Sequence, residues 1–456
     1  MKQTLVFLLS FMWVGGIAQS KPKIIAPVEG GFVPANEVQV TISKCQDLQN
    51  PRILLNDQSI AATFTQLTGL KRWTFNIPLE QAGSHELRVM AKCSKQMINQ
   101  TIRFSSDPQG VAELSSALIA RYDEIHQLEQ GYWNWGPAVF LYGLARLAHV
   151  HPDKTNYLNM IHRYYNNHHL KGIPTIDLAD RCAPVLASFL LDRPNHASKN
   201  QTSEVLEFIK STERNQIGSI NHLGTSIVSH FFPDSIWIDS LVMWNLVAFY
   251  ESQQQQDQEL ENFSLSQPSL FATYLKDPSS GLYLHAWNTK RNRPLPRKNT
   301  FWLRGNGWAL AAFGEILRQL PKSHPRYPEI AALFTDLAEA TRPKVLPSGL
   351  WDTLIANPGD GYEESSGSAL LAYSYALGHR LGLLSPDYRD QAQKTWVAIT
   401  SRMVPRGRGF TMEEISLGTN PSSKGGYAAI GKDRNVSYGV GAFLLLASEM
   451  LQEPSP

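Results

Sequence analysis

The chain has 456 residues, of which 43% are hydrophobic and 18% are charged, and its formal net charge at pH 7 is +2. This composition excludes a disordered chain and predicts either two or three domains or one large barrel with an accessory unit. The near-balance of charge gives no reason to expect nucleic acid or an acidic membrane surface as a partner. The eleven tryptophans favour a protein that packs indole faces against flat groups such as sugar rings.

Residues 1–20 have the pattern of a cleavable export signal. Lys2 precedes an apolar run over 5–17, and Ala18, Gln19 and Ser20 stand where cleavage requires small residues. The run is too short for a membrane span, and no cysteine near the cleavage point indicates a lipoprotein anchor. We therefore expect a periplasmic or secreted protein whose mature chain does not insert into a membrane.

Residues 21–106 predict a small antiparallel β-sandwich. Short β-rich runs at 38–42, 52–55, 63–64, 73–77 and 86–90 are separated by turn-forming residues. This region contains no cluster of residues typical of catalysis. We interpret it as an accessory or packing domain.

The three cysteines leave one pairing open. Cys45 and Cys93 both fall in strand-like runs, and in an oxidising compartment they form a disulfide if the fold brings them together. Spacing in the sequence does not establish that proximity. If they pair, Cys182 is an unpaired, buried thiol.

From residue 107 to the end, the pattern changes to helical periodicity. We count about twelve apolar-periodic segments, at 110–125, 133–150, 153–168, 181–192, 202–212, 238–252, 257–275, 303–319, 327–340, 366–383, 386–403 and 437–451. An even number of helices with no strands between them predicts six helix pairs closed into an (α/α)6 barrel over 107–456.

The links between these helices alternate in character. Links that follow the even-numbered helices are short and polar, whereas links that lead into them are long and rich in aromatic and ionisable residues. The richer links are at 132–136, 175–184, 236–241, 301–308, 363–368 and 435–441. A single Asp or Ser before a helix is commonly only an N-cap. Six such clusters on one rim of the barrel instead predict a concave functional site formed by these links.

Asp239 is the acidic residue most suited to chemistry in these links. It lies between Ile238 and Leu241, with Trp237 nearby. Burial among these side chains would raise its pKa, whereas the helix N-terminus would lower it. A carboxyl group that is partly protonated suits a general acid at a glycosidic centre, and an acidic residue in another link would complete a pair.

The link at 301–308 places Arg304 between Trp302 and Trp308. A guanidinium framed by indoles suits a carboxylated sugar, although an arginine that caps a loop would give the same pattern. His230 and His285 fall in two other rich links and lack the spacing of metal ligands. We expect them to form hydrogen bonds, and we expect no metal or cofactor.

Four of these motifs together resemble the unsaturated rhamnogalacturonyl hydrolases of glycoside hydrolase family 105, which are related to the unsaturated glucuronyl hydrolases of family 88. The motifs are Trp237–Met243, Phe301–Trp308, Glu364–Ala369 and Tyr438–Leu445. The resemblance spans about residues 110–450, and the Trp-Leu-Arg-Gly-Asn-Gly-Trp run within it is quite specific. The β-rich region lies outside it.

The resemblance implies an α/α-barrel enzyme that acts on oligosaccharides released by polysaccharide lyases. Such oligosaccharides carry a 4,5-unsaturated uronic acid at the non-reducing end. Family members hydrate this double bond: an Asp protonates C4, positive charge develops at C5, and water adds there. The hemiketal then opens and releases the rest of the chain.

The resemblance also implies roles for individual residues. Asp239 matches the general acid/base and Asp180 the second Asp, although Asp177, three residues earlier, is an alternative for the second role. The residues that match substrate contacts are Trp302, Arg304, Trp308, His285 and His230.

Two other functions remain compatible with these residues. One is another α/α-barrel carbohydrate enzyme, such as an inverting hydrolase or a polysaccharide lyase, and the other is a non-catalytic sugar-binding protein. Pectic rhamnogalacturonan and algal ulvan are both family substrates, and the sequence does not choose between them. The oligomeric state is also open.

Overall fold

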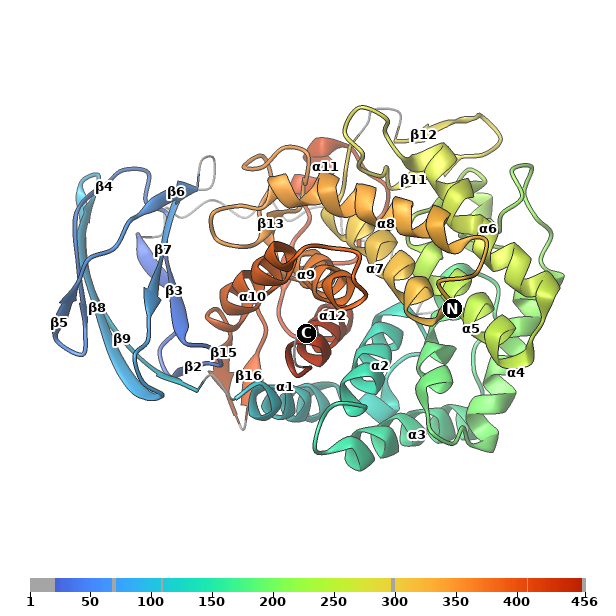
Figure 1. The fold of residues 1–456 in the computed structure, drawn as a ribbon, viewed down its shortest axis with the longest axis horizontal. Helices are drawn as coiled ribbons and strands as arrows, with labels where there is room; N and C mark the ends of the chain where they lie inside the picture. Colours follow the sequence, from blue (N-terminus) through green and yellow to red (C-terminus); the bar gives the residue numbers. More distant parts are fainter. Residues whose placement is uncertain (1–20, 68–70, 108–109, 297–299, 408, 453–456) are drawn as a thin grey trace.

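A computed structural model describes residues 21–67, 71–107, 110–296, 300–407 and 409–452 (Figure 1). The export signal expected in residues 1–20 lies outside these ranges. Within them, no helix has both the length and the apolar character that a membrane span needs.

The N-terminal part of the described chain forms two β-sheets. One has the strand order β1 (Lys23–Ala26), β3 (Glu37–Ser43), β7 (Arg72–Pro78) and β6 (Thr65–Leu67). The other has the order β2 (Gly31–Val33), β9 (Gln96–Ser106), β8 (Gly83–Cys93), β4 (Leu48–Leu55) and β5 (Gln58–Ile60). Four of the predicted runs fall within strands, whereas the run at 63–64 precedes β6. Buried and less buried residues alternate along β8, which is typical of a strand with one face on a core.

Cys45 and Cys93 are joined by a disulfide. Cys45 follows β3 of the first sheet and Cys93 ends β8 of the second, so the bond links the two sheets covalently. The two cysteines are 48 residues apart, and closing a loop of this length stabilises a fold by about 4 kcal/mol in the chain-entropy account. Cys182 is a buried free thiol.

The rest of the chain forms a barrel of two concentric layers of helices (Figure 1). The inner layer consists of α2 (Trp135–Ala148), the 3₁₀ helix η3 (Ala183–Leu190), α5 (Leu246–Gln255), α7 (Leu303–Gln319), α9 (Ser365–Arg380) and α12 (Ser437–Met450). Each inner helix contacts the next, and α12 contacts α2, which closes the ring. The outer layer consists of α1 (Val111–His126), α3 (Lys154–Lys171), α4 (His196–Ser211), α6 (Gln258–Leu275), α8 (Tyr327–Thr341) and α10 (Pro386–Thr400).

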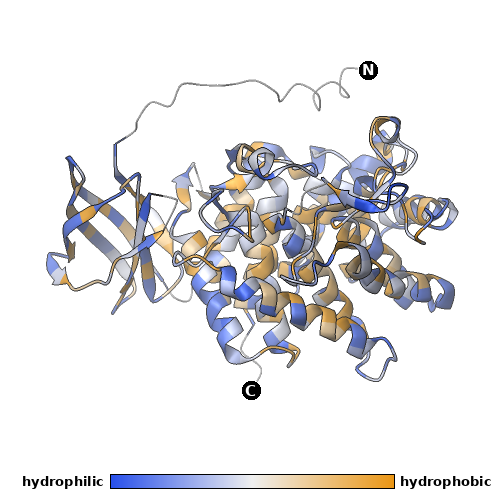
Figure 2. Ribbon diagram, turned by 90° about the horizontal axis from the view of Figure 1, so that it is seen from above, coloured by the Kyte–Doolittle hydropathy of each residue, from blue (hydrophilic) through white to orange (hydrophobic). Residues whose placement is uncertain are grey.

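Burial distinguishes the two layers. Every residue of α9 from Ser365 to Gly378 is buried, as expected of a helix that is surrounded by other helices. The outer helices bury one face only, and Figure 2 shows hydrophobic residues concentrated in the centre of the barrel. The predicted alternation of outer and inner helices is therefore present.

The helical segment predicted at 181–192 differs from the structure. It forms two 3₁₀ pieces, η2 (Ala179–Arg181) and η3, instead of an α-helix. Pro184 lies in the first turn of η3 and has no N–H to donate. This short segment then closes with the tighter i to i+3 bonds that such pieces commonly form.

Small strands occupy the links into the inner helices, where the sequence predicted none. They form a three-stranded sheet of β10 (Ser235–Trp237), β11 (Ala286–Asn288) and β12 (Arg293–Leu295) and three two-stranded pairs. The pairs are β13 (Trp351–Asp352) with β14 (Glu363–Glu364), β15 (Val404–Arg406) with β16 (Gly409–Thr411), and β17 (Ile415–Ser416) with β18 (Lys432–Asp433). A short helix, α11 (Lys424–Ala428), lies in the last link.

Candidate active site

The long links into the inner helices meet at one end of the barrel. The Trp133 indole N–H donates to the carbonyl oxygen of Arg181 at 3.0 Å, which joins the first link to the second. Trp135 stacks on Tyr438 with ring centroids 4.3 Å apart, which joins the first link to the last. The guanidinium of Arg304 lies 4.7 Å from the centre of the Tyr438 ring. The aromatic and ionisable clusters therefore form one continuous rim.

The second and third links contribute one carboxyl group each. Asp180 lies in η2, and its Oδ1 is 3.6 Å from Nε2 of His222. Asp239 lies between β10 and the turn that begins α5, and its Oδ2 is 3.2 Å from Nε2 of His285 without the alignment of a hydrogen bond. Each carboxyl group thus faces one imidazole.

Asp177, the alternative to Asp180, has a different partner. Its Oδ1 accepts a hydrogen bond from the Arg181 guanidinium at 2.6 Å. The electrostatic neighbour of Asp239 is Asp180. Of the two predicted candidates, Asp180 is the one that the structure brings together with Asp239.

The first imidazole, His222, is held on two sides. Its Nδ1 is 2.9 Å from the hydroxyl of Ser240. Its ring stacks on Trp237 with centroids 4.4 Å apart and planes within 11°. These contacts leave Nε2 directed toward Asp180.

The second imidazole, His285, is held in the same manner by other residues. Its Nδ1 is 2.8 Å from the hydroxyl of Tyr427 in α11. Its ring stacks on Trp302, 4.4 Å away between centroids. The backbone reinforces this arrangement, because the N–H of Ile238 donates to the carbonyl oxygen of His285.

The two carboxyl groups have opposite pKa shifts. Burial, together with the charge of Asp239, raises the pKa of Asp180 to about 7. Burial alone would also raise the pKa of Asp239, but the neighbouring imidazoles of His285 and His222 hold it below its ordinary value. A pair of carboxyls whose environments separate their pKa values is the usual arrangement for acid and base roles at one site.

Burial also lowers the pKa of His222 to about 4, against the raising effect of Asp239. His222 is therefore neutral at physiological pH. Near pH 7 the site combines one carboxyl that is close to half-protonated, one carboxylate and a neutral imidazole.

Arg304 is buried, with 1% of its side chain exposed, and its guanidinium is bonded within the protein. One terminal nitrogen donates to the carbonyl oxygen of Ser416 at 2.9 Å, and the other donates to that of Leu417 at 3.0 Å. Its Nε, together with the indole N–H groups of Trp302 and Trp308, is buried without a partner among the described residues. Trp302 and Arg304 form one packed layer, with the guanidinium 4.7 Å from the ring centre.

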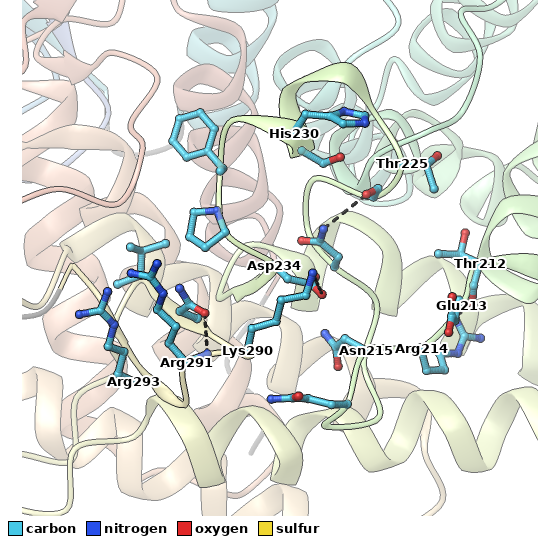
Figure 3. A pocket seen from close by; sticks show the side chains of 18 residues that line it. Thr212, Glu213, Arg214, Asn215, Thr225, His230, Asp234, Lys290, Arg291 and Arg293 are labelled. Atoms are coloured by element: carbon cyan, nitrogen blue, oxygen red, sulfur yellow. Dashed lines mark hydrogen bonds and ion pairs between the residues drawn. The ribbon is translucent and has the colours of Figure 1, made fainter.

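The structure does not bring His230 to this site. Its ring is exposed, and its Nδ1 is 3.3 Å from the carbonyl oxygen of Ile227 in a 3₁₀ turn, η4 (Ile227–His230). It lines a pocket whose lining residues include neither Asp180 nor Asp239 (Figure 3). His222, eight residues earlier in the same link, is the histidine beside the carboxyls.

The sequence does not single out His222 or Tyr427. The link from His230 to Asp239 is only nine residues long, and this short spacing was the available signal that an earlier histidine fits better. Tyr427 is distant in the sequence from every other residue of the site, and no local pattern marked it. Among the described residues, no group of three or more His, Cys, Asp or Glu side chains is arranged to hold a metal ion.

Comparison with known proteins gives concordant results. The sequence pattern of Glycosyl Hydrolase Family 88 matches residues 112–453. The unsaturated rhamnogalacturonyl hydrolase YesR of Bacillus subtilis is 25% identical over 323 residues, which cover 70% of this chain and 90% of that protein. An unsaturated 3S-rhamnoglycuronyl hydrolase of an Alteromonas species is 31% identical over 153 residues, 33% of this chain and 35% of its own length.

A solved structure shares the fold of the barrel. The crystal structure of a possible member of family 105 from Salmonella enterica superposes with a TM-score of 0.67 at 21% identity. The superposition covers 75% of this chain and 93% of that one. The expected α/α barrel is thereby confirmed as the fold of the helical part.

Proposed function

Because the chain belongs to glycosyl hydrolase family 88 and is a glycoside hydrolase, we propose that it removes a 4,5-unsaturated uronic acid from the non-reducing end of oligosaccharides. The observation that carries this proposal is the carboxyl pair, in which the pKa of Asp180 is raised to about 7 and that of Asp239 is lowered. The reaction named for the relative from Bacillus subtilis supports it.

The reaction needs one proton for C4 and one water for C5. When C4 is protonated, positive charge develops at C5 and on the ring oxygen. Water adds at C5 and gives a proton to the carboxyl pair. This proton replaces the one that the pair delivered to C4, so the protonation of the pair is restored in each cycle. The resulting hemiketal opens, and the bond to the rest of the oligosaccharide breaks.

We assign delivery of the proton to Asp239, as the Trp-x-Asp motif implies. In the free protein Asp239 is ionised, so it must gain a proton when substrate binds. The uronate brings a further negative charge, and a like charge raises the pKa of a neighbouring carboxyl. Asp180 shares the proton of the pair, and His285 orients the carboxyl group of Asp239.

We propose that the uronate lies against the layer formed by Trp302 and Arg304, with Trp308 and His285 completing its contacts. The positive charge of Arg304 favours an anionic ring at this position. The Nε of Arg304 and the indole N–H groups of Trp302 and Trp308 are buried without partners among the described residues, and buried polar groups are rarely left so.

The polymer that supplies the substrate is proposed to be pectic rhamnogalacturonan or ulvan, since lyases leave the required double bond on fragments of both. The test incubates the protein with lyase products of each polymer and identifies the products by mass spectrometry. We expect each oligosaccharide to shorten by one unsaturated residue, with one water gained. Shortening of saturated oligosaccharides would instead favour another α/α-barrel enzyme.

We also propose that the protein acts outside the cytoplasm. The export pattern of residues 1–20 motivates this proposal, and the disulfide between Cys45 and Cys93 is of a kind that persists in oxidising compartments. N-terminal sequencing of the protein from its native host tests it. An intact Met1 on the mature chain would contradict it.

A further inference from the structure

A pocket with a volume of about 890 Å³ is lined by residues of the two links that carry His222 and His285. Residues 212–216, 221–234 and 288–295 contribute its lining (Figure 3). Asn221 of this lining directly precedes His222, and Asn288 follows His285 by three residues. At about 3.3 Å per strand residue, Asn288 is about 10 Å from His285 along the chain.

The small sheet connects this pocket to the catalytic end of the link. In the pairing of β10 with β11, Trp237 is opposite Ala286, and Ser235 is opposite Asn288. Asp239 lies two residues after Trp237, and His285 directly precedes Ala286. At the other pair, Asp234 directly precedes Ser235, and Lys290 lies two residues after Asn288. An oligosaccharide with its unsaturated end at Asp239 therefore has this pocket within reach of its following units.

The pocket has an excess of positive charge. Its cations are Arg214, Lys290, Arg291 and Arg293, and its carboxylates are Glu213 and Asp234. In Figure 3, Arg291 and Arg293 lie on one side of the pocket, with Glu213 and Arg214 on the other.

Neutralisation within the pocket is incomplete. Lys290 makes only a loose ion pair, with its Nζ 3.8 Å from Oδ2 of Asp234, and 74% of its side chain is exposed. In the part of the chain that the structure describes, Arg214 and Arg291 form no ion pair. These unneutralised cations favour an anionic ligand.

The pocket also offers an aromatic face. Phe232 is part of the lining and is 41% exposed, and the neighbouring Phe231 is 82% exposed. An aromatic ring close to cations suits a sugar that carries a negative group, because the ring packs against the sugar face.

We propose that this pocket binds an anionic sugar on the leaving side of the cleaved bond. Lys290 and Arg291 hold its sulfate ester or carboxylate, and Phe232 packs against its ring. Arginine matches such oxyanions with paired N–H donors, and charge-assisted bonds of this kind are stronger than neutral ones. This assignment deepens the proposed function and rests on it for the position of the substrate.

Binding without turnover tests the pocket directly. Calorimetry compares rhamnose 3-sulfate, glucuronate and neutral rhamnose, none of which has the double bond. We expect one or both anionic sugars to bind at least about ten-fold more tightly than rhamnose. The anion that binds identifies whether sulfate or carboxylate is recognised.

The double variant Lys290→Gln/Arg291→Gln should reduce the preference for anionic sugars over rhamnose about ten-fold or more. The matched control is Arg52→Gln at an exposed position of β4, which should keep that preference. Added salt should weaken the preference in the wild type, because the cations are exposed. Equal binding of the three sugars, or a preference that survives in the double variant, would overturn the proposal.

Turnover separates this proposal from the proposed function. Wild-type protein is given unsaturated disaccharides with and without a sulfate on the second sugar. If anionic sugars bind more tightly than rhamnose but neither disaccharide is turned over, the proposed reaction is contradicted. The proposed binding of an anionic sugar in the pocket is then still supported. Turnover of both at equal rates, with equal binding of the three sugars, contradicts only the pocket.

Discussion

The carboxyl groups of Asp180 and Asp239 are chemically identical, and their surroundings give them different protonation. Asp180 is 3.6 Å from an imidazole whose pKa is lowered to about 4, so this neighbour is neutral at pH 7. Asp239 is 3.2 Å from His285, which favours its charged form. The difference in protonation thus follows from the burial of Asp180 beside the charge of Asp239 and from the contact of Asp239 with His285.

Substitution of single acidic residues tests these roles. We expect Asp239→Asn to reduce kcat by about 10²- to 10⁴-fold, the usual contribution of general acid–base catalysis, while binding of unsaturated disaccharide persists in calorimetry. Asp180→Asn should also lose most activity. Asp177→Asn is the matched control, because Asp177 pairs with Arg181, and it should keep activity within a few-fold. Near-normal turnover by Asp239→Asn would refute the assignment.

The pH dependence of kcat/KM provides a second test at this scale. The pair needs one proton, and Asp180 holds it with a pKa of about 7 in the free protein. kcat/KM should therefore be maximal below about pH 7 and fall about ten-fold per pH unit above it, because this parameter reports groups of the free enzyme. A profile that stays flat to pH 9 would contradict a proton on the pair.

The sequence predicted the positions of these carboxyls better than the position of the histidine. Asp239 is marked by its motif and by the inner helix that it precedes. The choice between Asp180 and Asp177 depended on which side chain the η2 turn directs toward His222. His222 and His230 lie in one irregular link, where no periodicity indicates which histidine faces inward.

At the scale of elements, β7 and β14 connect the N-terminal sheets to the active-site rim. Arg72 of β7 forms an ion pair with Glu363 of β14, whose side chain is fully buried. The next residue, Glu364, caps α9 and accepts a hydrogen bond from the N–H of Ser416 at 3.0 Å. Ser416 is also held by Arg304. The β region is thus bonded to the segment behind the proposed uronate site.

Replacement of Arg72 should affect both stability and substrate binding. Arg72→Met leaves Glu363 with Arg402, 3.7 Å away, as its remaining ion-pair partner among the described residues, and removing one partner of a buried ion pair costs about 3 to 5 kcal/mol. We expect a lower free energy of unfolding in urea titrations and a higher KM. Arg52→Met, on the exposed side of β4, is the control.

A second substitution checks the cause. Adding Glu363→Gln to Arg72→Met removes the unpaired charge and should recover part of the lost stability, as coupled residues do in a double-mutant cycle. Additive losses in the double variant would contradict a direct pair.

Most inner and outer helices were predictable because their apolar periodicity is long and regular. The strands β10 to β18 were not, because each is two or three residues long, and the pairing of β10 with β11 joins two different links. For example, Ser235 pairs with Asn288, and no local pattern encodes that register. The same links contribute most of the site, so the least predictable elements are those nearest the chemistry.

For the whole molecule, a buried polar cluster helps to close the barrel. Glu315 of α7 accepts hydrogen bonds from Arg146 of α2, Tyr250 of α5 and Tyr373 of α9. Burial alone would raise the pKa of Glu315, but Arg146 and Arg318 lower it to about 2. One carboxylate therefore ties four inner helices together.

Glu315→Gln should lower the free energy of unfolding at pH 7 by about 3 kcal/mol or more, because it leaves buried arginines without their counter-charge. The pKa of this carboxyl is lower in the folded state than its ordinary 4.5. Its contribution is therefore present above pH 4.5 and is lost as pH falls toward 2. Chemical denaturation at pH 7 and pH 3 should show a smaller difference between the variant and the wild type at pH 3. An equal difference at both pH values would contradict the charge argument.

The central proposal is that the rim hydrates an unsaturated uronate. The most direct measurement follows the ultraviolet absorbance of the C4=C5 double bond in lyase-generated oligosaccharides mixed with the wild-type protein. We expect this absorbance to fall with the wild-type protein and to persist with Asp239→Asn. Absorbance that persists with the wild type, across lyase products of both rhamnogalacturonan and ulvan, would contradict it.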